Sequence, residues 1–245
     1  MTSFHDELTH PALVAHRGYA LRYPENTIVS IRAALEAGAR AVEFDVQLTA
    51  DRIPVLLHDT SLKRTAGVDR EIFDLPLARA GVIVVGEPDR LGDAFAGVTL
   101  PTLADAVAVI DAWPDVMAFV ELKRASLRRF GNGCVVGRVL EDLEPVIDRA
   151  VVLSFDQDAV GLARDQGAAR IGWVIEACND DVRAEAERLA PDYLFCDRPL
   201  LPGTPWPGPW HWVVYGVETP EVATEIAARG VQIIETRAVG ELLGG

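Results

Sequence analysis

Two histidines in the first quarter of the chain lie close to acidic and basic residues. The run Val-Ala-His-Arg-Gly-Tyr contains His16 and Arg17. The second histidine is His58, and the carboxylates of Glu43 and Asp45 fall between the two. Imidazoles exchange protons near neutral pH, carboxylates bind hard cations, and a guanidinium binds phosphate oxygens. This combination is suited to metal-assisted cleavage of a phosphoester.

The two carboxylates share one strand. Glu43 and Asp45 lie two residues apart within Ala41–Gln47, an apolar run that reads as a buried strand. Side chains two residues apart on a strand point to the same face. Two carboxylates buried together repel each other unless a cation or an ordinary ion pair compensates them. A hard cation is one interpretation of this pair, and ion pairing with basic neighbours is the other.

The elements that position these residues follow a regular alternation, which is typical of a parallel α/β fold. The expected strands are Leu13–His16, Ala41–Gln47, Met117–Leu122, Ala150–Ser154, Arg170–Ile175, Tyr193–Cys196, Trp212–Val217 and Val231–Glu235. The expected helices are Asn26–Ala37, Leu103–Ala112, Gly133–Ile147, Gln157–Gln166, Asp180–Leu189 and Pro220–Arg229. Eight strands predict a (β/α)8 TIM barrel, formed as a single domain over residues 1–245, whose active site lies at the C-terminal mouth.

A ninth strand-like run, Ile53–Leu57, follows the second strand after only a few residues. A parallel neighbour needs a crossover of about a dozen residues, so this run must return antiparallel. A turn centred at Ala50-Asp51 sets Asp45 opposite Leu56. The resulting β-hairpin brings His58 back beside the carboxylates of the second strand.

Residues 60 to 100 lack a clear rhythm of strands and helices. A stretch this long inside a compact domain is usually functional or carries a small structure of its own. We expect an insertion that forms a lid or small subdomain and is not an independent domain.

The motifs around the histidines occur in a fixed order. They are His16-Arg17-Gly18, Pro24-Glu25-Asn26-Thr27, Glu43-x-Asp45, His58-Asp59 and Val120-Glu121-Leu122-Lys123. In this order they resemble the glycerophosphodiester phosphodiesterase family. Weaker matches follow at Leu62-Lys63-Arg64-Thr65, Leu100-Pro101-Thr102-Leu103, Ser154-Phe155 and Trp212. The resemblance extends from about residue 13 almost to the C-terminus, and it implies that the 60–100 insertion rises over the barrel mouth.

The resemblance also implies roles. It assigns His16 and His58 as general acid and general base, one activating the attacking oxygen and the other protonating the leaving alkoxide. Which does which is open, and the attacker is either water or a glycerol hydroxyl of the substrate. It further implies one divalent cation on Glu43, Asp45 and Glu121. These oxygen ligands favour Mg²⁺ or Ca²⁺ over zinc and do not choose between those two.

Substrate contacts are expected from three further residues. Arg17 is expected to bind the phosphate, with a surface salt bridge as the alternative. Lys123 shares its strand face with the third carboxylate and can contact the phosphate too. Trp212 is assigned to the glycerol pocket, although core packing explains it equally well. Glu25 is expected to orient neighbours or cap the first helix. Asp59 faces away from the preceding histidine on an extended chain, which indicates a supporting or turn role.

Three segments depart from the common pattern of the family. Asp51-Arg52 stands where the family commonly has Asp-Gly. Trp212-Val213-Val214-Tyr215 replaces W-T-V-N, and Ile234-Glu235-Thr236 replaces I-T-D. These positions lie outside the expected catalytic set, so they bear on substrate detail more than on the chemistry.

Composition limits the remaining possibilities. The chain has 245 residues, of which 49% are hydrophobic, so it can bury a full core. Its formal charge of −14 argues against nucleic acid as a partner and against binding to an anionic membrane surface. The polar start Met1–His10 does not read as a signal peptide, and no apolar stretch is long enough to span a bilayer. We therefore expect a cytoplasmic protein, monomeric or homodimeric, with a small-molecule substrate.

The sequence predicts an enzyme that hydrolyses glycerophosphodiesters to glycerol 3-phosphate and an alcohol, within lipid and glycerol metabolism. One rival is phospholipase or lysophospholipase D-type activity on lipid phosphodiesters, which requires an exposed apolar rim at the barrel mouth, and the lid sequence Val82–Val85 leaves that point open. The other is a non-catalytic barrel that binds a phosphorylated metabolite. The presence of both histidines and all three carboxylates argues against this second rival.

Overall fold

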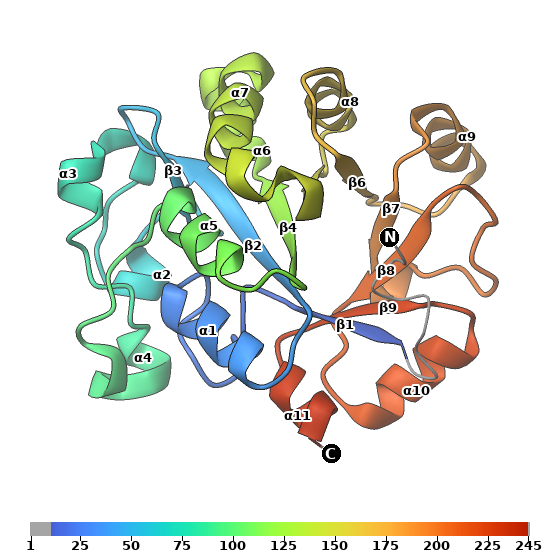
Figure 1. Ribbon diagram of the computed structural model, residues 1–245, viewed down its shortest axis with the longest axis horizontal. Helices are drawn as coiled ribbons and strands as arrows, with labels where there is room; N and C mark the ends of the chain where they lie inside the picture. Colours follow the sequence, from blue (N-terminus) through green and yellow to red (C-terminus); the bar gives the residue numbers. More distant parts are fainter. Residues whose placement is uncertain (1–10, 245) are drawn as a thin grey trace.

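The computed structural model describes residues 11–244, and its strands close into a barrel (Figure 1). Around the barrel the parallel strands are β1 (Ala12–Ala15), β2 (Ala41–Leu48), β4 (Met117–Leu122), β5 (Ala150–Ser154), β6 (Arg170–Val174), β7 (Tyr193–Asp197), β8 (His211–Tyr215) and β9 (Ile233–Thr236). Strand β1 pairs with both β2 and β9, which closes the ring. The expected TIM barrel is confirmed, and each strand lies within two residues of its expected bounds. The segment Met1–His10 lies outside the described residues.

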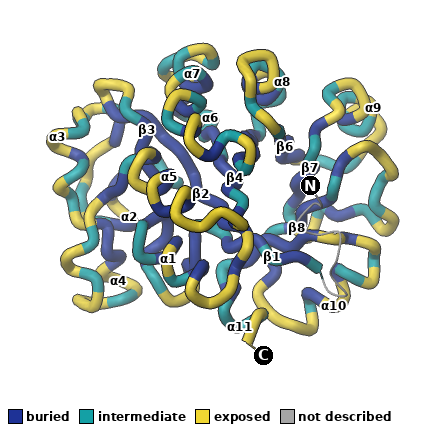
Figure 2. Tube along the Cα trace, viewed as in Figure 1, coloured by how far each residue is buried: buried dark blue, intermediate teal, exposed yellow. Residues whose placement is uncertain are grey.

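Helices cover the outside of the barrel and keep their polar faces in solvent (Figures 1 and 2). The six expected helices are α1 (Ile28–Glu36), α5 (Leu103–Asp111), α7 (Asn132–Leu143), α8 (Gln157–Asp165), α9 (Asp180–Leu189) and α10 (Pro220–Ala228). Outside residues 60–100, two further helices were not expected, α6 (Arg124–Phe130) and α11 (Val239–Gly244). Short 3₁₀ turns follow α7 at Glu144–Arg149 and β7 at Arg198–Leu200. Among the described residues, none of the helices has the length and apolar character needed to cross a membrane.

Two apolar layers hold the fold together. The barrel interior is filled by inward side chains from its strands, including Val14, Phe119, Val151, Phe195 and Val213. A larger layer packs the outer faces of the strands against the helices, for example Val42 and Val120 against Ile31 and Ile110. Alternation along each strand separates the two layers, so inward residues near a strand's carboxyl end face the mouth.

The hairpin after β2 is present, but its register differs from the expected one. Strand β3 (Pro54–Leu56) pairs antiparallel with β2 and places Leu56 opposite Val46, so the expected pairing of Asp45 with Leu56 is wrong by one residue. The turn spans five residues, since the Thr49 amide donates to the Ile53 carbonyl oxygen at 3.0 Å. An odd turn shifts the pairing by one position but keeps the second histidine near β2.

Residues 60–100 carry a small structure of their own. They contain α2 (Lys63–Ala66), α3 (Leu77–Ala80) and α4 (Pro88–Leu91), with 3₁₀ turns at Ile72–Asp74 and Gly92–Phe95. Leu62, Ile72 and Leu100 form an apolar cluster with Val55 of β3. This segment lies beside β3 and α1 in Figure 1. It is therefore packed onto the flank of the barrel through the hairpin.

Candidate active site

One cavity of about 210 Å³ opens where the carboxyl ends of the strands meet. Its polar side is lined by His16, Arg17, Glu43, His58, Glu121, Lys123 and Glu235. Its apolar side is lined by Leu153, Phe155, Val174, Phe195 and Tyr215. The cavity thus brings together both expected histidines, the basic residues Arg17 and Lys123, and two of the three expected carboxylates. The third carboxylate, Asp45, contacts this group.

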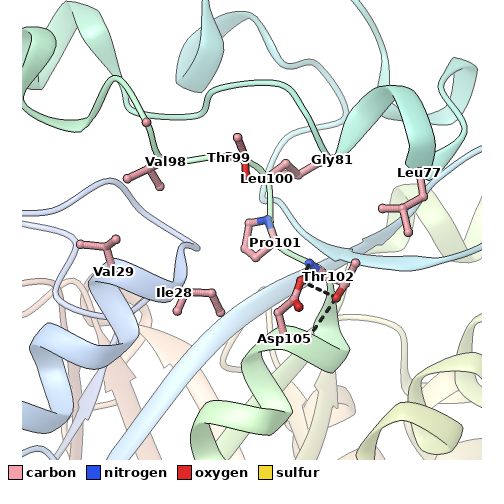
Figure 3. Close-up of a pocket in the computed structure, with 11 residues that line it drawn as sticks. Ile28, Val29, Leu77, Gly81, Val98, Thr99, Leu100, Pro101, Thr102 and Asp105 are labelled. Carbon is pink, nitrogen blue, oxygen red and sulfur yellow. Dashed lines mark hydrogen bonds between the residues drawn. The ribbon is translucent and has the colours of Figure 1, made fainter.

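A larger hollow of about 360 Å³ lies elsewhere, between the start of α1 and the segment 77–102 (Figure 3). Among the residues that line it, Asp105 alone carries a titratable side chain. That carboxylate accepts hydrogen bonds from the Thr102 amide and hydroxyl at 2.9 and 2.7 Å, which caps α5. This hollow offers no group for acid-base chemistry, so the mouth cavity is the candidate site.

A left-handed turn presents Arg17 to the cavity. Arg17 and Gly18 have φ values of 55° and 75°. A Cβ atom on Gly18 would lie 2.5 Å from the Ser30 Oγ and 2.6 Å from the Ser30 carbonyl carbon, so only glycine fits against α1. The turn also points the Arg17 amide at Glu43, whose Oε2 accepts its hydrogen bond at 3.0 Å.

The Pro24-Glu25-Asn26-Thr27 motif holds three different parts of the site. Asn26 Nδ2 donates to Asp45 Oδ2 at 2.8 Å, and Asn26 Oδ1 accepts from the Asp45 amide at 3.0 Å. Glu25 Oε1 accepts from Arg17 NH1 at 3.0 Å, so it orients a neighbour, as expected. The helix cap falls to Thr27, whose Oγ1 accepts from the Ser30 amide at 3.2 Å. The side chains of Glu25, Asn26 and Thr27 therefore each have a separate positional role.

Three carboxylates and a lysine meet at the adjoining ends of β2 and β4. Asp45 pairs with Glu121 across the two strands, which sets their side chains next to each other. One oxygen from each of Glu43, Asp45 and Glu121 lies within 4.8 Å of the others. Lys123 Nζ lies 3.1 Å from Asp45 Oδ1 and 2.8 Å from Glu121 Oε1. Glu43 and Asp45 thus share one face of β2 as expected, and Lys123 lies on the same side as Glu121.

The protonation of this cluster reflects the cost of burying charge. Burial, aided by the neighbouring Asp45, raises the pKa of Glu43 well above its usual range. Burial also raises the pKa of Glu121 to about 7, although Lys123 opposes the rise. At Asp45 burial works in the same direction, but the charges of Lys123 and Arg17 outweigh it and lower its pKa. Without a further positive charge, the cluster keeps protons at neutral pH.

A divalent cation fits this cluster. The Oε1 atom of Glu43 is buried and, within the described part of the chain, has no hydrogen-bond partner. A buried acceptor without a partner costs about 1–3 kcal/mol, which a bound cation would remove. The three donors are all oxygens, the ligand type of Mg²⁺ and Ca²⁺. The acidic set can therefore bind a divalent metal ion.

His16 follows β1 and lies beside a carboxylate that the sequence analysis did not single out. Its Nε2 is 3.2 Å from Glu235 Oε1 and 3.9 Å from Glu43 Oε2. Burial and the charge of Arg17 lower the pKa of His16 to about 3. Glu235 ends β9, the strand that neighbours β1. The first and last barrel strands thus supply this pair together.

His58 is held by the residue that follows it. Its Nδ1 lies 2.6 Å from Asp59 Oδ1, so the expectation that Asp59 faces away is wrong. The chain bends at residues 58–60 and is not extended there, which turns both side chains the same way. The expected supporting role of Asp59 is consistent with this contact.

Trp212 does not reach the cavity. Its side chain is buried between β8 and the outer layer, packs against Trp206, and donates from Nε1 to the Trp206 carbonyl oxygen at 3.0 Å. The assignment of Trp212 to the glycerol pocket is therefore corrected to core packing. The physical reason is alternation, since Val213 and Tyr215 occupy the inward positions of β8.

Comparison with known proteins agrees with this geometry. The sequence profile described as "Glycerophosphoryl diester phosphodiesterase family" matches residues 16–166. That is more than half of the 245 residues. The chain belongs to this family.

Similarity to individual members is partial in sequence and nearly complete in fold. The chain is 40% identical over 95 residues to glycerophosphodiester phosphodiesterase 1 of Bos taurus, covering 39% of this chain and 29% of that protein. It is 31% identical over 159 residues to a glycerophosphodiester phosphodiesterase of Bacillus altitudinis, covering 61% and 60%. The match thus spans less than a third of the mammalian relative.

Two solved structures of related enzymes share the fold. An Oleispira antarctica phosphodiesterase in complex with the product sn-glycerol-3-phosphate superposes with a TM-score of 0.83 at 22% identity, over 96% of each chain. A glycerophosphodiester phosphodiesterase from Thermotoga maritima superposes with a TM-score of 0.72 at 23% identity, over 96% of this chain and 97% of that one. At these identities the likeness establishes the barrel architecture.

Glu235 lines the cavity, although the sequence analysis did not expect it there. It was noted as a departure from the usual I-T-D pattern and placed outside the site. The signal was present in the alternation of β9, since an inward Ile233 makes Glu235 inward as well. Its position at the end of the last strand then places it at the mouth.

We predict that Glu235→Gln flattens the pH dependence of stability in the metal-free protein. Burial and the charges of Glu121 and Asp45 raise the pKa of Glu235 to about 8. The folded state therefore keeps a proton that the unfolded state releases above about pH 4.5, so wild-type stability falls as pH rises from there towards 8. Between pH 5 and 8 in EDTA, the wild type should lose at least about 1.4 kcal/mol more than the variant, the equivalent of one pKa unit.

Thermal unfolding in EDTA at several pH values measures this difference. Glu185→Gln on the outer helix α9 serves as the control, and its curve should run parallel to the wild-type curve. A parallel curve for Glu235→Gln as well would show that this carboxyl group does not hold its proton in the folded state.

Proposed function

We propose that this chain hydrolyses glycerophosphodiesters to glycerol 3-phosphate and an alcohol, with the help of a divalent cation. The observation that carries the proposal is one cavity lined by two imidazoles, two cationic side chains and a buried carboxylate cluster. Family membership supports it, as does the bound sn-glycerol-3-phosphate of the Oleispira antarctica structure. The apolar side of the cavity, with Phe155 and Phe195, can accept the carbon chain of a small alcohol.

The phosphate binds on the polar side of the cavity. Arg17 and Lys123 supply positive charge there, and both are already oriented by carboxylates. Arg17 NH1 lies 3.0 Å from Glu25, and Lys123 Nζ lies 2.8 Å from Glu121. Pre-orientation of this kind lowers the entropy lost on binding and favours a single pose of the diester.

Glu43, Asp45 and Glu121 would hold Mg²⁺ or Ca²⁺ beside the phosphate. The cation, when bound, supplies positive charge that stabilises the charge developing on the phosphoryl oxygens. With the cation bound, Glu43 and Glu121 would be ionised, as Asp45 already is, and Lys123 would remain beside Asp45 and Glu121.

The two histidines move the protons. One imidazole accepts the proton of the attacking water or substrate hydroxyl as its oxygen bonds to phosphorus. The other donates a proton to the alcohol oxygen as the second P–O bond breaks, so each P–O bond lost is matched by one formed. With a hydroxyl of the substrate as attacker, a water molecule opens the resulting cyclic phosphate in a second displacement. The proposal assigns these two roles to His16 and His58 as a pair.

The segment 60–100 completes the pocket. We include in the proposal that this insertion forms the side of the barrel mouth on which His58 lies. The hairpin that carries His58 packs its Val55 and Leu57 into the apolar cluster of the insertion. The insertion therefore supports one of the two proposed proton carriers.

A panel of glycerophosphodiesters with a coupled glycerol-3-phosphate readout tests the function. We expect turnover with Mg²⁺ or Ca²⁺, loss of turnover in EDTA, and recovery when the cation is restored. Faster turnover of lysolipid micelles than of any water-soluble diester would favour a phospholipase instead. No cation-stimulated turnover of any diester would leave only a binding protein.

A further inference from the structure

The guanidinium of Arg64 connects the segment that carries His58 to the loop that carries Glu25. Arg64 of α2 donates from Nε to Asp59 Oδ2 at 2.7 Å. From NH1 and NH2 it donates to the two carboxylate oxygens of Glu25 at 2.9 and 2.7 Å. Three N–H groups of one planar side chain thus bind two carboxylates from different segments.

The contacts continue on both sides. Asp59 Oδ1 lies 2.6 Å from His58 Nδ1, and Glu25 Oε1 accepts from Arg17 NH1 at 3.0 Å. We call this continuous chain, His58–Asp59–Arg64–Glu25–Arg17, the Arg64 network. It links a proposed proton carrier to the proposed phosphate ligand through a residue that touches neither.

The insertion forms a second set of hydrogen bonds with the loop that carries Glu25. Glu87 Oε1 accepts from the Glu25 amide at 2.6 Å. Arg90 donates to Glu87 Oε2 at 2.6 Å and to the Tyr23 carbonyl oxygen at 2.8 Å. The Glu87 side chain itself is buried. The insertion therefore fixes both the backbone and the side chain of Glu25.

The geometry of the network restricts His58. With the ionised Asp59 at Nδ1, that nitrogen carries the hydrogen of the neutral ring, and Nε2 is left for proton exchange in the cavity. Hydrogen bonds from Arg64 and His58 outweigh burial and lower the pKa of Asp59, which keeps it ionised. A fixed tautomer and ring orientation are what a proton carrier needs before substrate arrives.

We propose that Arg64 is a positioning residue for the reaction, which holds His58 through Asp59 and Arg17 through Glu25. The inference rests on the proposed function, since it takes His58 and Arg17 as the groups that act on the diester. Lysine cannot replace Arg64, because a single ammonium lacks the planar fork that binds both carboxylates at once.

Arg64→Ala and Arg64→Lys test the proposal, with Arg183→Ala as a matched control. Arg64 and Arg183 are 45% and 41% exposed, and Arg183 forms its ion pair with the exposed Glu187 on the outer helix α9. We expect kcat for glycerophosphocholine to fall about 10–100-fold in both Arg64 variants. The control should stay within twofold of the wild type, and unfolding temperatures of all variants report that they fold.

Chemical rescue of Arg64→Ala distinguishes a positioning role from a merely structural one. Guanidinium chloride at low concentration should restore part of the activity of Arg64→Ala, while an equal concentration of sodium chloride should not. It should not rescue His58→Ala, in which the proton carrier itself is missing. Where Arg64→Ala fails to fold, Arg64→Lys decides the question, because it retains the charge and lacks the fork.

The state of His58 can also be read without turnover. In protein with ¹⁵N-labelled histidine, His58 should show one Nδ1–H tautomer in the wild type and a mixture of tautomers in Arg64→Lys and Arg64→Ala. The missing signals of His58→Gln assign the resonances. If the wild type hydrolyses no diester, the proposed function fails, and this spectrum still decides whether Arg64 fixes the ring.

Two results would overturn the inference. One is activity of both Arg64 variants within twofold of the wild type. The other is a loss of activity with an unchanged His58 tautomer and no rescue by guanidinium, because the loss would then arise outside the network.

Discussion

Replacing His58 by alanine should lower kcat for glycerophosphocholine by about 10²–10⁴-fold, the usual contribution of a proton carrier. The side chain is 34% exposed and lies at the end of the hairpin, so its removal opens no cavity in the core. The unfolding temperature should therefore stay within a few degrees of the wild-type value. Steady-state kinetics with added Mg²⁺ or Ca²⁺ give the measurement.

His58→Gln is the companion variant. Glutamine keeps a hydrogen-bonding side chain next to Asp59 but cannot exchange a proton at neutral pH, so it should be about as slow as alanine. Near wild-type kcat in either variant would remove His58 from the proton transfers and leave His16 and solvent to carry them.

Replacing Glu43 by glutamine should change activity and stability in opposite directions. The variant removes one oxygen ligand of the proposed cation, so turnover should fall at least about 10²-fold. In EDTA at pH 7.5 the same variant should unfold at a higher temperature than the wild type. Burial raises the pKa of Glu43, so at this pH the folded wild type bears a cost that a neutral amide avoids.

The added cation separates the two effects. Wild-type protein should gain about 2.7 kcal/mol when Mg²⁺ or Ca²⁺ is present at a hundred times its dissociation constant. Glu43→Gln should lose most of that gain. Glu176→Gln serves as the control, because Glu176 forms an exposed ion pair with Arg124. It should change neither the turnover nor the stabilisation by the added cation. Full cation stabilisation in Glu43→Gln would move the metal site away from β2.

Most of the barrel could be predicted from the sequence because its strands carry a strong signal. Runs such as residues 150–153 are apolar throughout, as is typical of strands buried on both faces, and helices with a polar face separate these runs. The expected grouping of His16, His58 and the carboxylates of β2 follows from this alternation and from the short hairpin. Those inferences depend on spacing that the barrel enforces.

Features that depend on local turns were harder to predict. The register of β3 shifts by one residue because Arg52 adopts φ 63° in a five-residue turn, the region that the usual glycine of the family favours. Helix α6 was missed because Arg124–Phe130 is only seven residues long and joins α7 through Gly131. Short helices without a long apolar stripe leave little periodicity to detect.

Contacts between distant side chains could not be predicted at all. The sequence motif Leu62-Lys63-Arg64-Thr65 gave no indication that Arg64 reaches Glu25, which is 39 residues away. Ion pairs of this kind depend on how the insertion packs against the barrel. Hydrophobic periodicity predicts helices and strands but does not predict the packing of loops. The outward direction of Trp212, by contrast, follows from the alternation of side chains along β8, in which Val213 and Tyr215 point inward. The sequence analysis did not apply this alternation to Trp212.

The pairing of β1 with β9 has a consequence for protein synthesis. His16, Arg17, Glu43, Asp45 and His58 precede Glu235 and the closing strand β9 in the chain, so they are synthesised well before it. Without β9 one edge of β1 has no partner strand, and an unpaired edge favours pairing with other chains. The complete cavity can therefore form only when the last strand docks against β1.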